Sequence, residues 1–151
     1  MSLFNSLEIS ATALTAERLR MDVTAENLAN AQTTRGANGG PYRRKEVVLR
    51  QAAQGPDFSS QLRVAMTGAG RAGLAAGGVQ VAAIAEDQNP PKMIYQPGHP
   101  DANPQGYVAM PNVDSVMEMV DLISSSRAYE ANVTAMQASK QMFTKTLDLL
   151  R

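Results

Sequence analysis

The strongest constraint on this chain is a helical repeat in its C-terminal segment, residues 112–151. From Leu122 onward, side chains at alternating steps of four and three fall on one stripe of an α-helix. The large members of this stripe are Leu122, Tyr129, Val133, Met136, Phe143, Leu147 and Leu150. A partner helix covers a stripe of this spacing, so the segment predicts a long helix packed against a second one.

A second stripe, of mostly small residues, runs along the same segment. Its members are Ala128, Ala131, Ala135, Ala138 and Met142. At about 100° per residue it lies roughly 130° around the helix from the first stripe. Because a surface helix of a monomer needs only one buried face, the second stripe predicts a contact with a neighbouring subunit.

Residues 3–29 predict another helix with the same spacing. Leu7, Leu14, Met21 and Leu28 are a heptad apart, and the span contains neither glycine nor proline. Turn-forming residues between positions 33 and 41 then end the helix. Since both terminal helices carry stripes of coiled-coil spacing, we expect them to pair with each other as a coiled coil.

Shorter elements are expected between the helices. Residues 54–78 are poor in large apolar side chains, which predicts a mobile loop. Asn112 is expected to cap the C-terminal helix. Runs of β-forming residues predict four strands, at 43–51, 79–85, 92–96 and 107–110.

The fold class expected from these elements is mainly α with a small β insert. We expect an N-terminal helix and its following motif at 1–34, a β-rich hairpin region containing the loop at 35–111, and a C-terminal helix at 112–151 that packs on the first part. A chain of 151 residues is long enough for one ordinary domain with its own core.

Composition narrows the possible functions. The 14 basic and 14 acidic residues cancel, which argues against a general affinity for nucleic acid or anionic membranes. The absence of cysteine excludes disulfides and thiolate chemistry within the chain. No apolar run approaches the roughly 20 residues that span a bilayer. The first residues also lack the basic and apolar regions of a cleavable signal peptide.

Three patterns resemble chemical sites but have simpler structural explanations. Residues 68–73 match the glycine spacing of dinucleotide-binding loops, but the residues after them cannot form the required helix. His99 is the only histidine, and a turn role between prolines is favoured over metal binding. Asp114, Glu118 and Asp121 share a helical face near a positive helix end, without a nucleophile beside them. We therefore expect no catalytic residues, cofactor or metal site, and no enzymatic activity.

The charges are unevenly distributed. Residues 35–50 contain five basic side chains and one acid, Glu46, whereas residues 86–121 contain six acids and one lysine. A nucleic-acid surface and a solvated strand are both possible explanations of the basic run. The explanation that we favour is complementarity, in which the basic segment of one subunit meets the acidic segment of another.

Several motifs, in order along the chain, resemble those of flagellar rod, hook and hook-associated proteins. The first follows the N-terminal helix, and the second precedes the C-terminal one. Further matching runs lie at 118–123, 126–132 and 140–142. The signature residues are Asn27, Leu28, Ala29 and Asn30, then Gly106, Tyr107, Pro111, Asn112, Val113 and Asp114. The resemblance is strongest to the proximal rod members of the flagellar basal-body rod protein family.

This resemblance implies a structural subunit of the proximal rod, located in the periplasm-spanning basal body of the bacterial flagellum. The terminal helices would form an inner layer of the rod and the insert an outer layer. The partners implied are the chain itself, other rod proteins and the flagellar type III export apparatus, which would export the chain without cleavage. No nucleic acid, small-molecule substrate or membrane span is implied.

There are two alternatives to this interpretation. One is that the chain is another axial protein of the flagellum, either a sister proximal rod protein or a distal rod protein, although it resembles these less closely. The other is a soluble coiled-coil adaptor that only dimerises.

Overall fold

The computed structural model describes residues 3–36, 39–52, 66 and 77–149. The predicted mobile loop at 54–78 lies outside the described residues except at positions 66, 77 and 78. The glycine pattern at 68–73 and Leu150 lie outside them as well.

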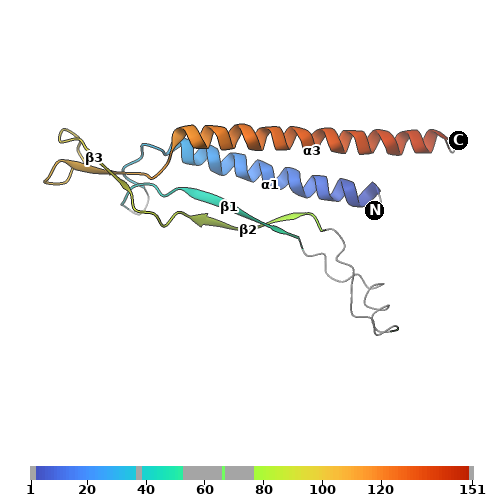
Figure 1. The fold of residues 1–151 in the computed structure, drawn as a ribbon, viewed down its shortest axis with the longest axis horizontal. Helices are drawn as coiled ribbons and strands as arrows, with labels where there is room; N and C mark the ends of the chain where they lie inside the picture. The colour runs from blue at the N-terminus through green and yellow to red at the C-terminus, as the bar shows by residue number, and fades with distance from the viewer. Residues whose placement is uncertain (1–2, 37–38, 53–65, 67–76, 150–151) are drawn as a thin grey trace.

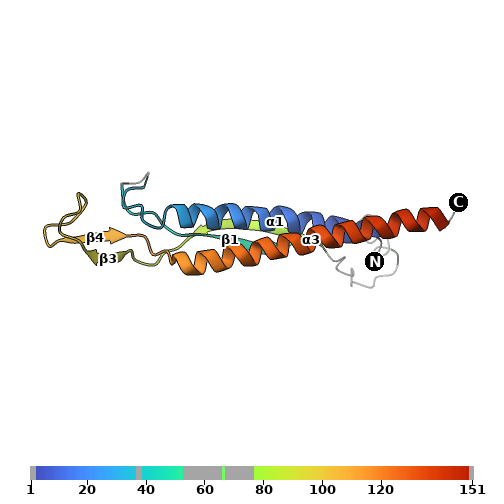
Figure 2. The same cartoon turned by 90° about the horizontal axis from the view of Figure 1, so that it is seen from above.

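Two long antiparallel helices form the body of the molecule. Helix α1 spans Leu3–Ala29 and helix α3 spans Ser115–Leu149, and they lie side by side along most of α1 (Figures 1 and 2). At about 1.5 Å per residue α3 is roughly 12 Å longer than α1, and it extends past the N-terminal end of α1. The predicted helix at 3–29 is therefore confirmed.

Two antiparallel hairpins make up the insert. Strands β1 (Lys45–Gln51) and β2 (Val79–Glu86) pair from Lys45↔Glu86 to Gln51↔Val79, with an irregularity at Val48/Leu49. Strands β3 (Lys92–Tyr95) and β4 (Tyr107–Met110) form the second hairpin. All four predicted strands are present, and the fold is mainly α with a small β insert. The first strand begins two residues later than predicted, at Lys45.

The β1–β2 hairpin lies against α1, on a side that α3 does not cover (Figure 1). Residues of β1 alternate between half-buried and exposed, with Val47 and Leu49 on the half-buried face. Just before β2, Gly78 passes so close to Thr12 that a Cβ at this position would lie 2.0 Å from the Thr12 hydroxyl oxygen. That hydroxyl accepts a hydrogen bond from the Val79 amide, so a glycine here allows the strand to dock on the helix.

Asp114, and not Asn112, caps α3. The Asp114 carboxylate accepts hydrogen bonds from the amides of Val116 at 3.0 Å and Met117 at 3.4 Å, which are among the free donors of the first turn. The prediction of Asn112 as the cap was wrong because the helix begins at Ser115, three residues further on.

The apolar core among the described residues is small. Ala16, Val23, Val108 and Val113 are its buried members, and polar Thr24, Asn27, Glu118 and Ser125 are equally inaccessible. None of the described helices is long and apolar enough to cross a membrane. The arrangement is an elongated helix pair with an unusually polar centre.

Replacing Asp114 with alanine should lower the free energy of unfolding by about 1 kcal/mol, because two amides of the first turn lose their acceptor. Ser115→Ala, one residue further into the exposed first turn, is the matched control and should change stability by less than about 0.5 kcal/mol. Urea denaturation followed by circular dichroism measures both. Equal effects of the two substitutions would contradict the assignment of the cap.

Candidate functional site: the Asn27 junction

The side chain of Asn27 joins three elements at one end of the helix pair. It is 1% exposed and lies in the last turns of α1. Its Oδ1 accepts hydrogen bonds from the Tyr42 hydroxyl at 2.8 Å and the Lys45 amide at 2.9 Å. Its Nδ2 donates to the Lys45 carbonyl at 2.8 Å and to Glu118 Oε2 at 3.1 Å. All the hydrogen-bonding capacity of this amide is used, which is what burial requires.

Glu118 brings α3 into the same network. Its side chain is 2% exposed, and its Oε1 accepts a hydrogen bond from Arg44 Nε at 2.5 Å. Arg44 also reaches Asp121 Oδ2 at 3.6 Å and Glu46 Oε2 at 3.8 Å. A carboxylate with so little access to water is tolerated only when it is paired and hydrogen-bonded. We call Asn27, Tyr42, Arg44, Lys45 and Glu118 the Asn27 junction.

Charge and burial perturb two groups of the junction. Burial, and then the negative charges of Glu26, Glu118 and Glu86, raise the pKa of Tyr42 to about 12. The phenol therefore stays protonated and donates to Asn27 at neutral pH. The hydrogen bond to Glu118 is the main reason why the pKa of Arg44 is raised, which keeps the guanidinium charged.

A short loop brings Tyr42 and β1 back to α1. Helix α1 ends where Asn30 Nδ2 donates to the Glu26 carbonyl at 2.9 Å and the Asn30 Oδ1 accepts from Thr33 at 3.1 Å. The Tyr42 amide then donates to the Thr33 carbonyl at 3.1 Å, which closes the loop. Asn30 thus acts locally at the helix end, whereas Asn27 bonds to distant segments.

Three basic residues of the segment 35–50 form ion pairs with acidic residues of the same chain. Arg35 pairs with Asp101 at 2.7 Å, and Lys45 pairs with Glu26 at 2.6 Å. Arg44 pairs with Glu118, as described above. The expected complementarity between the two segments is present for Arg35 and Arg44, but their acids belong to the same chain, so the prediction that it joins different subunits is wrong for these two residues. The partner of Lys45, Glu26, lies outside the acidic segment.

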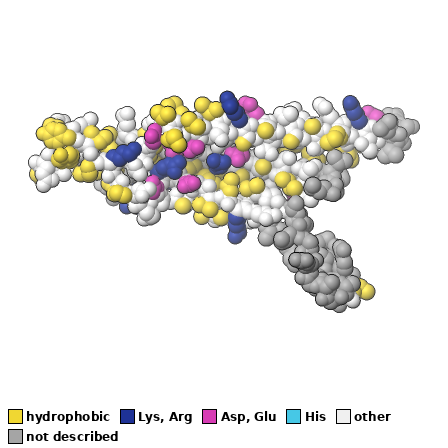
Figure 3. All heavy atoms as spheres, in the orientation of Figure 1, with side chains coloured by type: hydrophobic (Ala, Val, Ile, Leu, Met, Phe, Trp, Pro, Cys, Tyr) yellow, Lys and Arg dark blue, Asp and Glu magenta, His cyan; other side chains and the backbone are white. Residues whose placement is uncertain are grey.

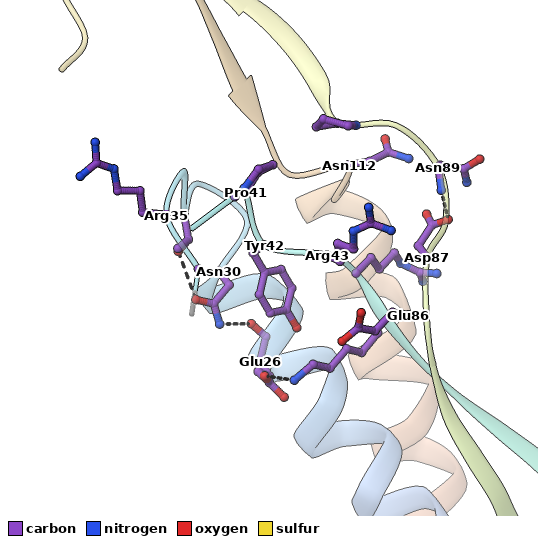
Figure 4. Close-up of a pocket in the computed structure, with 16 residues that line it drawn as sticks. Glu26, Asn30, Arg35, Pro41, Tyr42, Arg43, Glu86, Asp87, Asn89 and Asn112 are labelled. Carbon is purple, nitrogen blue, oxygen red and sulfur yellow. Dashed lines mark hydrogen bonds and ion pairs between the residues drawn. The ribbon is translucent and has the colours of Figure 1, made fainter. Parts of the chain in front are cut away.

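An open cavity of about 890 Å³ adjoins the junction (Figure 4). It lies between the end of α1, the loop leading into β1 and the segment that follows β2. Charged side chains of both signs line it, including Glu26, Arg43 and Glu86. Backbone and side-chain hydrogen bonds from Asn89 lower the pKa of Asp87 at its edge. Its lining includes no His, Cys or Ser, and no cluster of metal-ligating side chains occurs in the described part of the chain.

The predicted large stripes of the two helices are mostly half-buried. Leu7, Leu14, Met21 and Leu28 on α1 are in this class, and so are Leu122, Tyr129, Val133 and Met136 on α3. Phe143 and Leu147 are 37% and 50% exposed, on the part of α3 near its C-terminal end.

The most buried line of α1 was not predicted. It contains Ala16, Val23, Thr24 and Asn27. Helix α1 contacts α3 on one side and the β1–β2 hairpin on another, so residues between the two neighbours are covered twice. The heptad residues Leu14 and Met21 lie roughly 140–160° around the helix from Ala16, on the other side of α1, and are only half-buried. The available sequence signal for this buried line was the spacing of Ala16, Val23 and Asn27, at steps of seven and four residues.

The small stripe of α3 is largely uncovered. Ala131, Ala135, Ala138 and Met142 are exposed, and Ala128 is half-buried. The stripe lies beside the surface that α3 turns towards α1.

The remaining signature residues shape the approach to α3. Gly106 has a φ of +81°, and a Cβ there would lie 2.8 Å from the Tyr95 ring. Pro111 and Val113 are buried, Asn112 is half-buried in the lining of the cavity, and Asp114 caps the helix. On α1, Leu28 is half-buried and Ala29 exposed, and on β4 Tyr107 is 43% exposed.

Comparison with known proteins identifies the family to which this chain belongs. Residues 7–37 match the family described as flagella basal body rod protein, and residues 105–149 match the C-terminal family of flagellar basal body rod FlgEFG proteins. The two matches cover most of α1 with the first part of the loop after it, and β4 with α3. The chain belongs to the flagellar basal-body rod proteins, a structural family and not a family of enzymes.

Full-length relatives define its place within that family. The chain is 53% identical to the flagellar basal-body rod protein FlgC of Bacillus subtilis over 153 residues, covering 99% of both chains. It is 45% identical to FlgC of Escherichia coli O157:H7 over 149 residues, covering 99% of this chain and 98% of the relative. FlgC of Borreliella burgdorferi is 43% identical over 157 residues, covering 100% of this chain and 99% of that one. The chain therefore belongs to the FlgC proteins, and it is a structural subunit of the proximal rod of the flagellar basal body.

The raised pKa of Tyr42 predicts an alkaline loss of stability. Between pH 10 and 12 the unfolded chain releases the phenolic proton while the folded chain retains it, so the unfolded state binds fewer protons and the free energy of unfolding falls as pH rises. Denaturation at a series of pH values measures this fall, which Tyr42→Phe should reduce. Absorbance titration at 295 nm should show the tyrosinate signal that Tyr42→Phe removes to be centred near pH 12. A signal centred near pH 10 would contradict the buried hydrogen bond.

Removing the cation of the junction should be costly. Arg44→Met leaves the Glu118 carboxylate buried without a counter-charge, which should lower the free energy of unfolding by about 3 kcal/mol. Adding Glu118→Gln removes the buried charge and should recover at least about 1 kcal/mol of that loss. Arg43→Met, at the exposed neighbouring arginine, is the control and should cost less than about 0.5 kcal/mol. Additive effects of the two junction substitutions would show that the ion pair is unimportant.

Proposed function

We propose that this subunit enters the rod through its two terminal helices, with α1 and α3 pairing as a coiled coil and the small stripe of α3 contacting a neighbouring subunit. The observation that carries the proposal is the exposure of the small stripe on a helix whose other face is already covered by α1. A soluble monomer gains nothing from a second apolar face.

The exposed flank of α3 is long and continuous. Met117 is 58% exposed and Met142 is 53% exposed, with Ala131, Ala135 and Ala138 exposed between them. At 100° per residue these five positions fall within roughly 60° of one another. Alanines let two helices approach closely, and the methionines at the ends adapt to irregular surfaces. Contacts between different surfaces of identical subunits generate an open helical array, as a rod requires.

Family membership supports the rest of the proposal. The terminal segments, 1–34 and 112–151, form an inner layer of the rod, and the insert, 35–111, forms an outer layer. The subunit has no enzymatic role, and it reaches the periplasm-spanning rod uncleaved through the flagellar type III export apparatus. Its partners are other copies of the chain and the other rod proteins, with no nucleic acid and no small-molecule substrate.

Ala135→Leu tests the small stripe. Leucine is a good helix former, so the isolated subunit should keep its helical content and solubility. Its added volume should weaken the helix–helix contact by about 1–3 kcal/mol, so the variant should be exported but should not enter the rod. Motility of cells whose only copy carries the variant, together with its content in purified basal bodies, measures the effect.

Two further variants make this test specific. Gln137→Leu adds the same side chain on the other exposed flank of α3 and should assemble normally. Met136→Asp places a charge in the half-buried surface towards α1, so it should unfold the subunit itself. Normal assembly of Ala135→Leu would contradict the proposed interface.

A further inference from the structure

The β3–β4 hairpin is an arm that is joined to the rest of the molecule at its base. Among the described helices and strands, β3 and β4 contact only each other. The arm projects beyond the end of the helix pair (Figures 1 and 2). The connection into β3, residues 88–91, is exposed throughout, whereas Pro111 and Val113 in the connection after β4 are buried. An arm attached only at its base is free to swing about that base, so a contact further out is needed to fix its direction.

Such a contact is made by the turn between β3 and β4. In this turn, Asp101 Oδ1 pairs with Arg35 Nη2 at 2.7 Å, and Asp101 Oδ2 accepts a hydrogen bond from the Thr34 hydroxyl at 2.8 Å. Both carboxylate oxygens are thus bound by the loop that follows α1. We call Asp101, Arg35 and Thr34 the Asp101 clasp.

Both sides of the clasp are ordered by bonds of their own. On the arm, the Asp101 amide donates to His99 Nδ1 at 3.1 Å, which holds the backbone of the turn. On the other side, the Tyr42 amide donates to the Thr33 carbonyl at 3.1 Å and closes the loop that carries Arg35. Because the two segments are already ordered, closing the clasp costs little backbone entropy.

The distribution of charge makes this contact specific. Asp101 is the only acidic residue between positions 88 and 113, and Lys92 is the only Lys or Arg there. On the face that Figure 3 shows, the hairpin end carries hydrophobic side chains and no charged ones, and charged side chains of both signs lie nearer the helix pair. Arg35 therefore has a single carboxylate on the arm with which it can pair.

The clasp differs from the Asn27 junction in its access to water. The side chain of Arg35 is 75% exposed and that of Asp101 is 20% exposed, whereas Glu118 in the junction is 2% exposed. An exposed ion pair stabilises weakly and is screened by salt. The clasp can therefore open while the buried junction holds α1, β1 and α3 in place.

We infer that the Asp101 clasp is a lock on the direction of the β3–β4 arm. While the clasp is closed, the arm continues the long axis of the helix pair, as in Figures 1 and 2. When the clasp opens, the arm swings about its base, and the packed connection after β4 anchors it there. This lock is a property of one subunit and does not depend on how subunits contact one another in the rod.

The absence of cysteine allows two spin labels to be placed in the full chain. Asp22→Cys, exposed on α1, and Gln105→Cys, exposed on the arm next to β4, provide the attachment sites. Pulsed electron paramagnetic resonance on the dilute subunit measures the distance between the labels. The intact clasp should give one dominant distance. Arg35→Glu or Asp101→Lys should each lower the ratio of this population to all others at least about fivefold, because each places like charges opposite one another.

Three controls make the measurement specific to the ion pair. Arg35→Glu combined with Asp101→Lys restores opposite charges and should recover most of the dominant population. Arg50→Glu, at an exposed arginine of β1, should change the ratio less than about twofold. Adding about 1 M salt should lower the ratio for the intact clasp and raise it for Arg35→Glu, because salt screens an attraction in one and a repulsion in the other.

A separate measurement shows whether the arm itself stays folded. The rings of Tyr95 and Tyr107 pack edge to face with centroids 5.3 Å apart, so near-ultraviolet circular dichroism reports the pairing of β3 with β4. This signal should be unchanged in the single variants, and its loss would overturn the inference, because the clasp would then hold the hairpin together and not direct it.

Three results of the distance measurement would also overturn the lock. They are an unchanged ratio in both single variants, no recovery in the double variant, and the same direction of salt dependence with and without Arg35→Glu. Each of them would leave the proposed function standing, since the measurement needs no assembly.

Discussion

The carboxylate of Glu118 lies where water reaches almost none of it, and the surrounding groups are arranged to donate to it. Arg44 supplies the charge and Asn27 supplies an amide proton, while Asn27 itself is saturated by β1 and Tyr42. Leaving any one of these groups unpaired in this setting would cost far more than a surface ion pair contributes. The network therefore admits one arrangement of α1, β1 and α3, and it determines the direction in which each element leaves the junction.

Away from this junction the molecule has little apolar core to hold it together. Ala16 and Val23 are the only fully buried apolar residues of α1 among those described, and the far part of α3 is exposed. Long helices with one thin seam remain extended, so the subunit has a large surface for its size. A polar junction is well suited to this shape, because directional hydrogen bonds define an angle that a small hydrophobic contact would leave loose.

The proposed contacts between subunits account for the exposed apolar residues of α3. The small stripe lies on α3, and the exposed residues Val116, Val120 and Ile123 lie at the start of the same helix. The family match at 105–149 covers β4 and all of α3, while residues 38–104 fall outside both family matches. The part of the chain that presents the proposed helical contacts is thus the part shared with other rod proteins, as expected if different rod proteins must pack on one another.

The sequence by itself determined the elements of this protein and its family. Helix α1, the four strands and the long C-terminal helix follow from periodicity and turn residues, which act over a few positions and need no knowledge of the fold. The roles of single residues were decided only by tertiary structure. Asn27 and Asn30 belong to one motif at the end of α1, but the partner of Asn27, Glu118, lies 91 positions away. Arg35 and Arg44 were assigned to contacts between subunits, but the fold brings Asp101 and Glu118 to them. The buried line of α1 depends on having two neighbours at once, because burial is a property of what surrounds a helix and no repeat within the helix can specify it.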